Sequence, residues 1–111
     1  MRIKQFAEKY LLDPREVMYF VECGLLHPER DKANGFYYDF GPAEEEEIKK
    51  ILIVKAMDCK PIDQYVAMLD VLPNAMWKSV VFDKIQENIN KSIYMLNTAK
   101  QYAEELKKKK A

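Results

Sequence analysis

The 111-residue sequence contains only three glycines, two cysteines and one histidine. Cys23 and Cys59 lie far apart, with no C-x-x-C pair and no histidine cluster, so we expect neither a disulfide framework nor a metal site. No uncharged stretch approaches the roughly 18 residues of a membrane-spanning helix, and early charges leave no apolar segment for a signal peptide. With 49% apolar and 32% charged residues, the composition is not that of a disordered chain. The sequence predicts one small, soluble, cytoplasmic protein without cofactors.

The formal net charge is zero, but the charges are unevenly distributed. Residues 1–70 contain ten basic and 14 acidic side chains, whereas residues 71–111 contain eight basic and four acidic ones. The two parts therefore carry about −4 and +4. This asymmetry matters for nucleic-acid binding, which normally uses a basic surface.

Two short helices are predicted at the amino end. Ile3, Phe6, Ala7 and Tyr10 follow helical spacing and predict a helix over 3–12. Asp13-Pro14 then supplies an N-cap and a first-turn proline, with Glu16 three residues after the cap, and Gly24 is expected to end the second helix. Two helices joined by a tight turn resemble a helix-turn-helix.

A β-hairpin is predicted after Gly24. Residues 25–28 and 36–40 are short β-favouring runs, and Asn34-Gly35 between them is a hairpin turn signal. Strict alternation would place Phe36 and Tyr38 on one face and Tyr37 on the other. A hairpin at this place would form a wing beside the two helices.

Two more helices are predicted, over 42–57 and 62–69. Gly41-Pro42 begins the first, with Glu44–Glu47 near the positive end of its dipole, and the break at 58–61 ends it. Tyr65, Val66 and Leu69 are expected to face inward from the second. Residues 1–70 would form a winged helix-turn-helix domain.

Residues 71–111 are predicted to form a long helix that opens at Pro73 and ends in Lys107–Lys110. A heptad frame fits it, with Phe82, Ile89, Leu96 and Ala103 at position a and Ile85, Ser92, Ala99 and Leu106 at position d. Ile93 widens this seam, as do Met95 and Tyr102. We expect an antiparallel homodimer through these helices, with interface residues Phe82, Ile85, Ile89, Ile93, Leu96, Ala99, Ala103 and Leu106. The alternative is a helix folded back on its own domain.

The order of these elements resembles the MerR family of bacterial transcriptional regulators. Gly24-Leu25-Leu26-His27-Pro28-Glu29-Arg30 matches the family's G-L-L-x-P-x-R segment, and Asn34-Gly35-Phe36-Tyr37-Tyr38 is similar to its wing. The resemblance implies a homodimer whose two heads occupy successive major grooves of double-stranded DNA and distort a promoter for RNA polymerase. It implies no separate ligand domain here. Met18 and Tyr37 stand where the family carries arginines expected to hold phosphates, so we expect weaker binding than in a typical member.

The DNA-binding candidates are side chains that could hold phosphates or reach a groove: Lys4, Arg15, Tyr19, Arg30, Lys32, Tyr37 and Tyr38. Residues 1–40 contain six basic and seven acidic side chains, so a second hypothesis keeps the fold but makes it a protein-interaction module. His27 fits a surface or cap position better than a ligand, and the lysine tail fits a solvated helix end. Around Trp77 the apolar residues fit a plain junction better than a pocket. No catalytic constellation is present, and we expect no enzyme activity.

Overall fold

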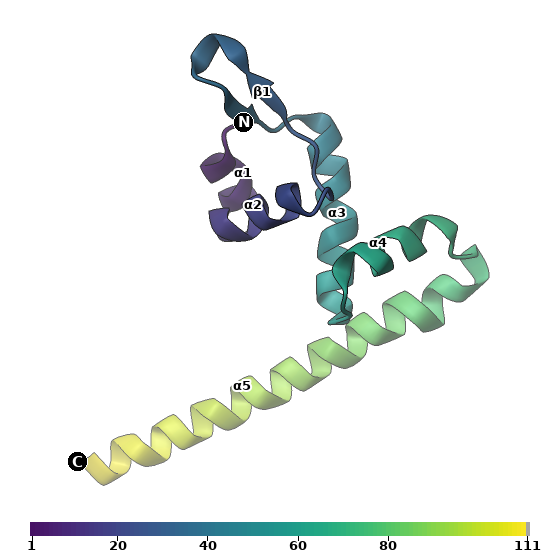
Figure 1. The fold of residues 1–111 in the computed structure, drawn as a ribbon. Coiled ribbons are helices and arrows are strands. Elements are labelled where there is room, and N and C mark those ends of the chain that lie inside the picture. Colours follow the sequence, from purple (N-terminus) through teal and green to yellow (C-terminus); the bar gives the residue numbers. More distant parts are fainter. Residues whose placement is uncertain (111) are drawn as a thin grey trace.

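The computed structural model describes residues 1–110 and is mostly helical, with one two-stranded antiparallel sheet and a long carboxy-terminal helix (Figure 1). Helices α1 (Ile3–Lys9) and α2 (Pro14–Glu22) are followed by strands β1 (Glu29–Asp31) and β2 (Tyr37–Asp39). Helix α3 (Pro42–Met57) then leads through α4 (Ile62–Val71) to α5 (Asp83–Lys110). None of the helices within these 110 residues has both the length and the apolar character needed to cross a lipid bilayer.

Local signals explain the ends of α2. The Asp13 side chain accepts a hydrogen bond from the Arg15 amide at 2.8 Å, which satisfies a free N–H of the first turn. Gly24 follows the helix with a φ of 76°, a conformation that glycine adopts without strain. These observations confirm the predicted start and end of this helix. Glu16 does not complete a capping box, however, because its carboxylate pairs with Lys55 of α3.

Helix α1 is shorter than predicted. It ends at Lys9, and Leu11 adopts a φ of 56° in the turn before α2. A leucine at positive φ interrupts helical hydrogen bonding, and its side chain is 94% exposed. The prediction that the helix continues to Leu12 is therefore wrong.

The hairpin forms, but its first strand is displaced from the prediction. Glu29 pairs with Asp39, Arg30 with Tyr38 and Asp31 with Tyr37, while residues 25–28 are not a strand. Leu26 is instead buried in the core, because these residues carry the chain from α2 across to the hairpin. A 3₁₀ turn, η1 (Lys32–Asn34), and Gly35 at a φ of 83° connect the strands. Phe36 has a φ of 61° and precedes β2, so it does not share a strand face with Tyr38.

A single apolar core joins α1, α2, the hairpin and the first half of α3, and we call this part the head. Eight buried side chains form that core: Phe6, Ala7, Val17, Phe20, Leu26, Phe40, Ile48 and Ile51. Phe6 stacks on Phe40, with ring centroids 4.6 Å apart. Glu44 is also buried, and its carboxylate accepts a hydrogen bond at 2.8 Å from the Gly41 amide, as expected for a helix start.

A second buried cluster lies where α3, α4 and the beginning of the long helix meet. Val54, Met57, Leu69 and Val81 form it, with Tyr65 and Val66 half-buried around them. The predicted α4 therefore faces inward as expected. The last element does not begin as one regular helix: a 3₁₀ turn, η2 (Asn74–Met76), and a π-helical segment, η3 (Lys78–Phe82), precede α5.

Helix α5 extends away from the head as a rod, and the molecule measures 59 × 42 × 20 Å (Figure 1). It contacts α3 at its beginning, where the Asn88 amide donates a hydrogen bond to the Ala56 carbonyl at 2.9 Å. Farther along, its large apolar side chains are exposed. The alternative of a rod folded back along its whole length on its own head does not describe this structure.

Candidate nucleic-acid interface

The outer face of α2 carries two of the predicted DNA-binding residues. Arg15, Met18, Tyr19 and Glu22 follow helical spacing, opposite the buried Val17 and Phe20. The Arg15 side chain is 94% exposed, and its Nε lies 3.4 Å from a carboxylate oxygen of Asp13. Tyr19 is 56% exposed. This face therefore presents one guanidinium and one phenol to solvent, together with the Glu22 carboxylate.

The hairpin carries four further candidates in two different roles. Arg30 and Tyr38 are engaged with each other across the strands: the guanidinium carbon lies 3.9 Å from the ring centroid, and Arg30 donates hydrogen bonds to the Tyr38 hydroxyl and the Phe36 carbonyl. Lys32 is exposed in the turn and Tyr37 is 65% exposed on β2. The first pair maintains the hairpin, whereas the side chains of Lys32 and Tyr37 are largely exposed to solvent.

Arg2 belongs to this surface although the sequence did not indicate it. Its guanidinium lies 5.2 Å from the Tyr37 ring centroid and donates to a carboxylate oxygen of Asp31 at 3.2 Å. The amino end thereby packs against the hairpin, and the Met1 ammonium also binds Asp39 at 2.8 Å. These contacts span more than 25 residues of sequence, so no local motif indicates them. Their effect is to attach the hairpin to the amino end of α1.

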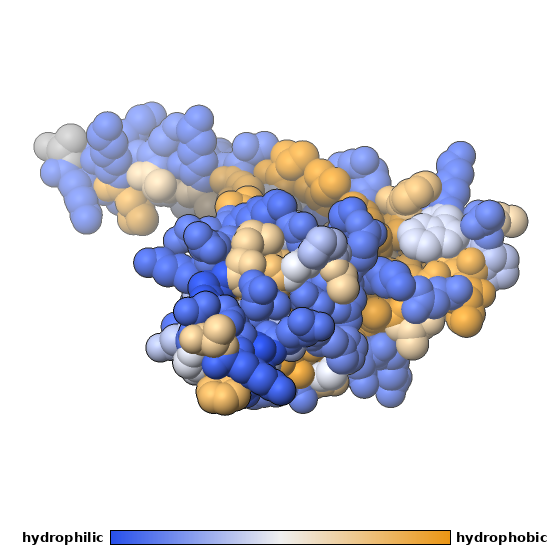
Figure 2. Space-filling model, turned by 90° about the horizontal axis from the view of Figure 1, so that it is seen from above, coloured by the Kyte–Doolittle hydropathy of each residue, from blue (hydrophilic) through white to orange (hydrophobic). Residues whose placement is uncertain are grey.

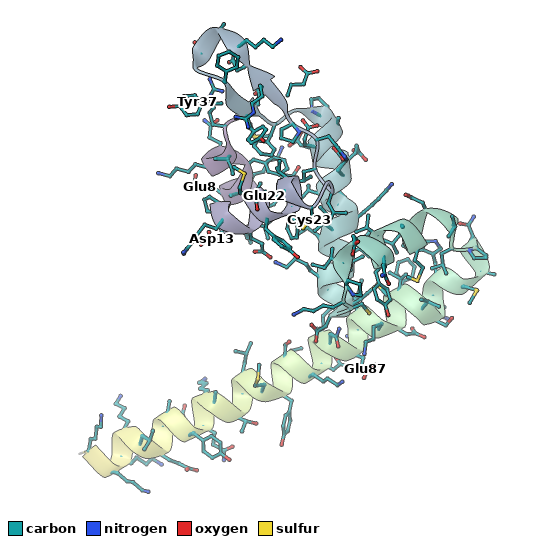
Figure 3. The ribbon with its side chains drawn as sticks, in the orientation of Figure 1. Glu8, Asp13, Glu22, Cys23, Tyr37 and Glu87 are labelled. Atoms are coloured by element: carbon teal, nitrogen blue, oxygen red, sulfur yellow. The ribbon has the colours of Figure 1, made fainter. Side chains whose placement is uncertain are left out.

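Several head cations are partly neutralised by neighbouring carboxylates. Arg2 pairs with Asp31, Lys9 with Glu45, and Arg15 with Asp13. In the described residues Lys4 and Lys32 make no ion pair, and neither do the acidic Glu8, Glu22 and Glu29. Figure 3 shows Glu8, Asp13 and Tyr37 along the same side of the head. The candidate face is thus mixed in charge and not a continuous basic stripe.

Hydrogen bonding shifts the acidities of several groups on the head. The backbone N–H of Arg15 holds the pKa of Asp13 below its usual value, and the Asn34 amide does the same for the pKa of Asp31. A hydrogen bond with the Cys23 thiol raises the pKa of Tyr19. Tyr19 is therefore a neutral phenol near pH 7, able to donate a hydrogen bond to an anionic oxygen.

Behind α2 lies an open groove of about 900 Å³ between that helix and the α3–α4 connection. Tyr19, Cys23 and Cys59 contribute to its lining, with Lys55 and Asp58 at the end of α3. Neither of these two cysteines forms a disulfide in the described residues. Within residues 1–110 no group of three or more histidine, cysteine or acidic side chains is arranged to hold a metal ion.

The predicted dimer residues are exposed along the end of η3 and along α5, apart from Ile85. Phe82 is 59% exposed, Ile89 46%, Ile93 53%, Leu96 65% and Leu106 59%, and Ala99 and Ala103 are exposed as well. Ile85 is half-buried against the cluster formed by Val54 and Met57. Seen from above the head, apolar side chains gather along the rod, whereas the head surface is mainly hydrophilic (Figure 2).

Comparisons with protein-family models, with curated proteins and with solved structures each find no match to this chain.

Proposed function

We propose that this protein is a homodimeric, MerR-like DNA-binding regulator with a winged helix-turn-helix head and no separate ligand domain. The observation that carries the proposal is the exposed outer face of α2 beside an exposed hairpin, on a head attached to a rod with an uncovered apolar face. An exposed apolar face of this length marks an interaction surface. Two heads linked through their rods would bind two half-sites on one side of a DNA duplex.

The proposed contacts divide into two kinds. Arg15 and Tyr19 would enter the major groove from α2, and Lys32 and Tyr37 would contact the backbone beside it. Lys4 lies on α1, where it would add a phosphate contact, while Arg30 and Tyr38 would act by maintaining the wing. This set supplies few unpaired cations, which is consistent with modest affinity and a small dependence on salt.

The test is a selection of bound duplexes from a randomised DNA pool, followed by fluorescence-anisotropy titration of the enriched duplex and a scrambled one. Titrations at about 50 and about 200 mM salt separate specific from nonspecific binding. We expect Arg15→Gln to weaken the enriched duplex more than the scrambled one. Lys32→Gln should weaken both, and it should lower the salt slope by about two, one for each head of the dimer.

Lys78→Gln is the matched control, because Lys78 is an exposed lysine in η3, outside the head. It should leave both affinities unchanged. If no duplex is enriched, and the Arg15 and Lys32 variants bind DNA as the unaltered protein does at both salts, the DNA-binding proposal is overturned.

The second candidate function, a protein-interaction module, is favoured by the mixed charge of the head. Glu8, Glu22 and Glu29 are free of ion pairs among the described residues, and carboxylates repel a phosphate backbone. Such a module would recognise a basic partner. Specific capture of a basic protein by the unaltered head, lost in Glu22→Gln and unaffected by competing DNA, would favour it over the regulator.

A further inference from the structure

The turn between α1 and α2 holds a leucine in a conformation that favours glycine. The Leu12 N–H donates to the Ala7 carbonyl at 2.8 Å, and the Leu11 N–H donates to the Glu8 carbonyl at 3.3 Å. These two hydrogen bonds form a Schellman motif, in which the residue at the position of Leu11 has a left-handed backbone and is usually glycine. Leu11 has a φ of 56°, at which its Cβ crowds the following carbonyl oxygen.

The Leu11 side chain contributes almost nothing to packing. It is 94% exposed, the largest exposed fraction among the large apolar side chains of residues 1–110. Leu12 behaves differently, because it packs half-buried against the core that contains Ala7. A glycine at position 11 would make the same two hydrogen bonds without strain. The fold therefore explains the backbone of this turn but not its leucine side chain.

Two other residues with a side chain have a positive φ in residues 1–110, and the fold accounts for both positions. Asp58 follows the end of α3, and aspartate is among the residues that tolerate this conformation. Phe36 continues the hairpin turn after Gly35, and its carbonyl accepts a hydrogen bond from Arg30. Leu11 differs from them because it combines a positive φ with nearly complete exposure of an apolar side chain. Strain of this kind is typical of functional positions.

The turn that contains Leu11 lies on the side of the head that carries proposed DNA contacts. Glu8 and Asp13, which precede and follow Leu11 in the chain, lie on the same side as Tyr37 (Figure 3). Asp13 caps α2, and the Arg15 side chain in the first turn of that helix is 94% exposed. In a helix-turn-helix complex, residues at the beginning of the second helix contact base edges. The Leu11 side chain would then lie beside Arg15, against the bases of the major groove.

We propose that Leu11 recognises thymine, by packing against the 5-methyl group of that base in the major groove. This inference rests on the DNA-binding function proposed above and names a base that the head selects. Thymine is the one standard base that presents an apolar group in the major groove. At any other base, the leucine would remove water from a polar edge without supplying a hydrogen bond, which is unfavourable.

A single leucine suits a methyl group better than it suits a protein surface. Docking sites for proteins are usually contiguous apolar patches of about several hundred Å². Lys9, Asp13 and Arg15 near Leu11 are exposed and charged, so no such patch surrounds it. The Schellman motif also fixes the Leu11 backbone before DNA binds, so that less conformational entropy is lost on binding.

The test removes one methyl group at a time. In the duplex enriched by the selection described above, deoxyuridine replaces each thymine in turn, which deletes the 5-methyl group and keeps the hydrogen-bonding pattern. Fluorescence anisotropy gives the affinity of each duplex for the unaltered protein, Leu11→Ala and Leu11→Gly. Circular dichroism verifies folding, and Leu11→Gly relieves the strain, so a folded variant is at hand. Val71→Ala is the matched control, because Val71 is 79% exposed at the end of α4, outside the head.

We expect one thymine in each half-site whose replacement weakens binding by the unaltered protein. The loss should be about fourfold for one half-site, as expected for one buried methyl group, and about fifteenfold for both. Leu11→Ala and Leu11→Gly should bind the thymine and deoxyuridine duplexes within about twofold of each other, since the methyl group has lost its contact. Val71→Ala should show the same losses as the unaltered protein.

The inference is overturned if every replacement affects the unaltered protein and the Leu11 variants equally, or if no replacement affects the unaltered protein. Either result leaves the DNA-binding proposal standing, because specific binding of the enriched duplex has still been measured. If the DNA-binding proposal is itself overturned as described above, this inference falls with it. Loss of a captured basic protein in Leu11→Ala, with every DNA affinity unchanged, would overturn the inference in favour of protein docking.

Discussion

Replacing Phe6 with alanine should remove a large share of the stability of the head. Phe6 is fully buried, stacks on Phe40 at 4.6 Å and contacts the Tyr10 ring at 5.1 Å. A Phe→Ala change in a packed core costs about 3–5 kcal/mol, through lost burial and the cavity that remains. Because small domains are stable by only about 5–15 kcal/mol, this is a large share of the total. Val17 and Phe20 lie in the same core, so α2 would lose its support.

The assay is urea unfolding followed by far-ultraviolet circular dichroism, at one fixed protein concentration because a dimer's stability depends on concentration. Phe6→Leu keeps the site apolar and should cost less than about 1.5 kcal/mol. Tyr94→Ala is the control, since Tyr94 is 75% exposed on the rod and outside the a and d positions. A loss below about 1 kcal/mol for Phe6→Ala, similar to that of Tyr94→Ala, would refute the assignment of the core.

Four further outcomes are expected. Gly35→Ala should destabilise the protein by about 1–2 kcal/mol in urea unfolding, because φ is 83° and the new Cβ would lie 3.3 Å from the Tyr37 ring, and Gly35→Asn should cost less. Leu11→Gly should raise stability by up to about 1 kcal/mol, because glycine adopts the φ of 56° without strain. Asp13→Ala should destabilise the protein at neutral pH. Since the folded carboxyl has the lower pKa, this difference should shrink as pH falls below the ordinary value of 3.8 and through the folded pKa. Ile89→Glu should produce monomers in sedimentation velocity, whereas Tyr94→Glu, on the outer side of the rod, should not.

The DNA contacts and the homodimer of the regulator proposal depend on different parts of the chain. The homodimer rests on the exposed apolar side chains of α5, while DNA binding requires that a few cations on the head overcome neighbouring carboxylates. The structure makes the second requirement demanding, since Arg2, Lys9 and Arg15 all contact acidic side chains. Removing one such carboxylate, for example with Asp13→Asn, therefore also changes the field that a phosphate would meet.

The sequence alone determined those features that depend on residues close together along the chain. Asp13-Pro14 begins α2, Gly24 follows its end, and Gly41-Pro42 begins α3, because capping and backbone conformation act over three or four residues. The long helix and its apolar seam could also be predicted from the sequence, since a heptad pattern repeats along one chain. The predicted hairpin turn at Asn34-Gly35 was correct for the same reason.

Only the tertiary structure decided which residues became strand, core or ion pair. Leu25–Pro28 has β-favouring residues, yet Leu26 is core and the strand begins at Glu29, because strand preference is weaker than the demand to bury an apolar side chain. The pairing of Glu16 with Lys55 and the packing of Arg2 on Tyr37 join residues more than 30 positions apart. Such contacts depend on how the helices pack, and no local rule encodes them.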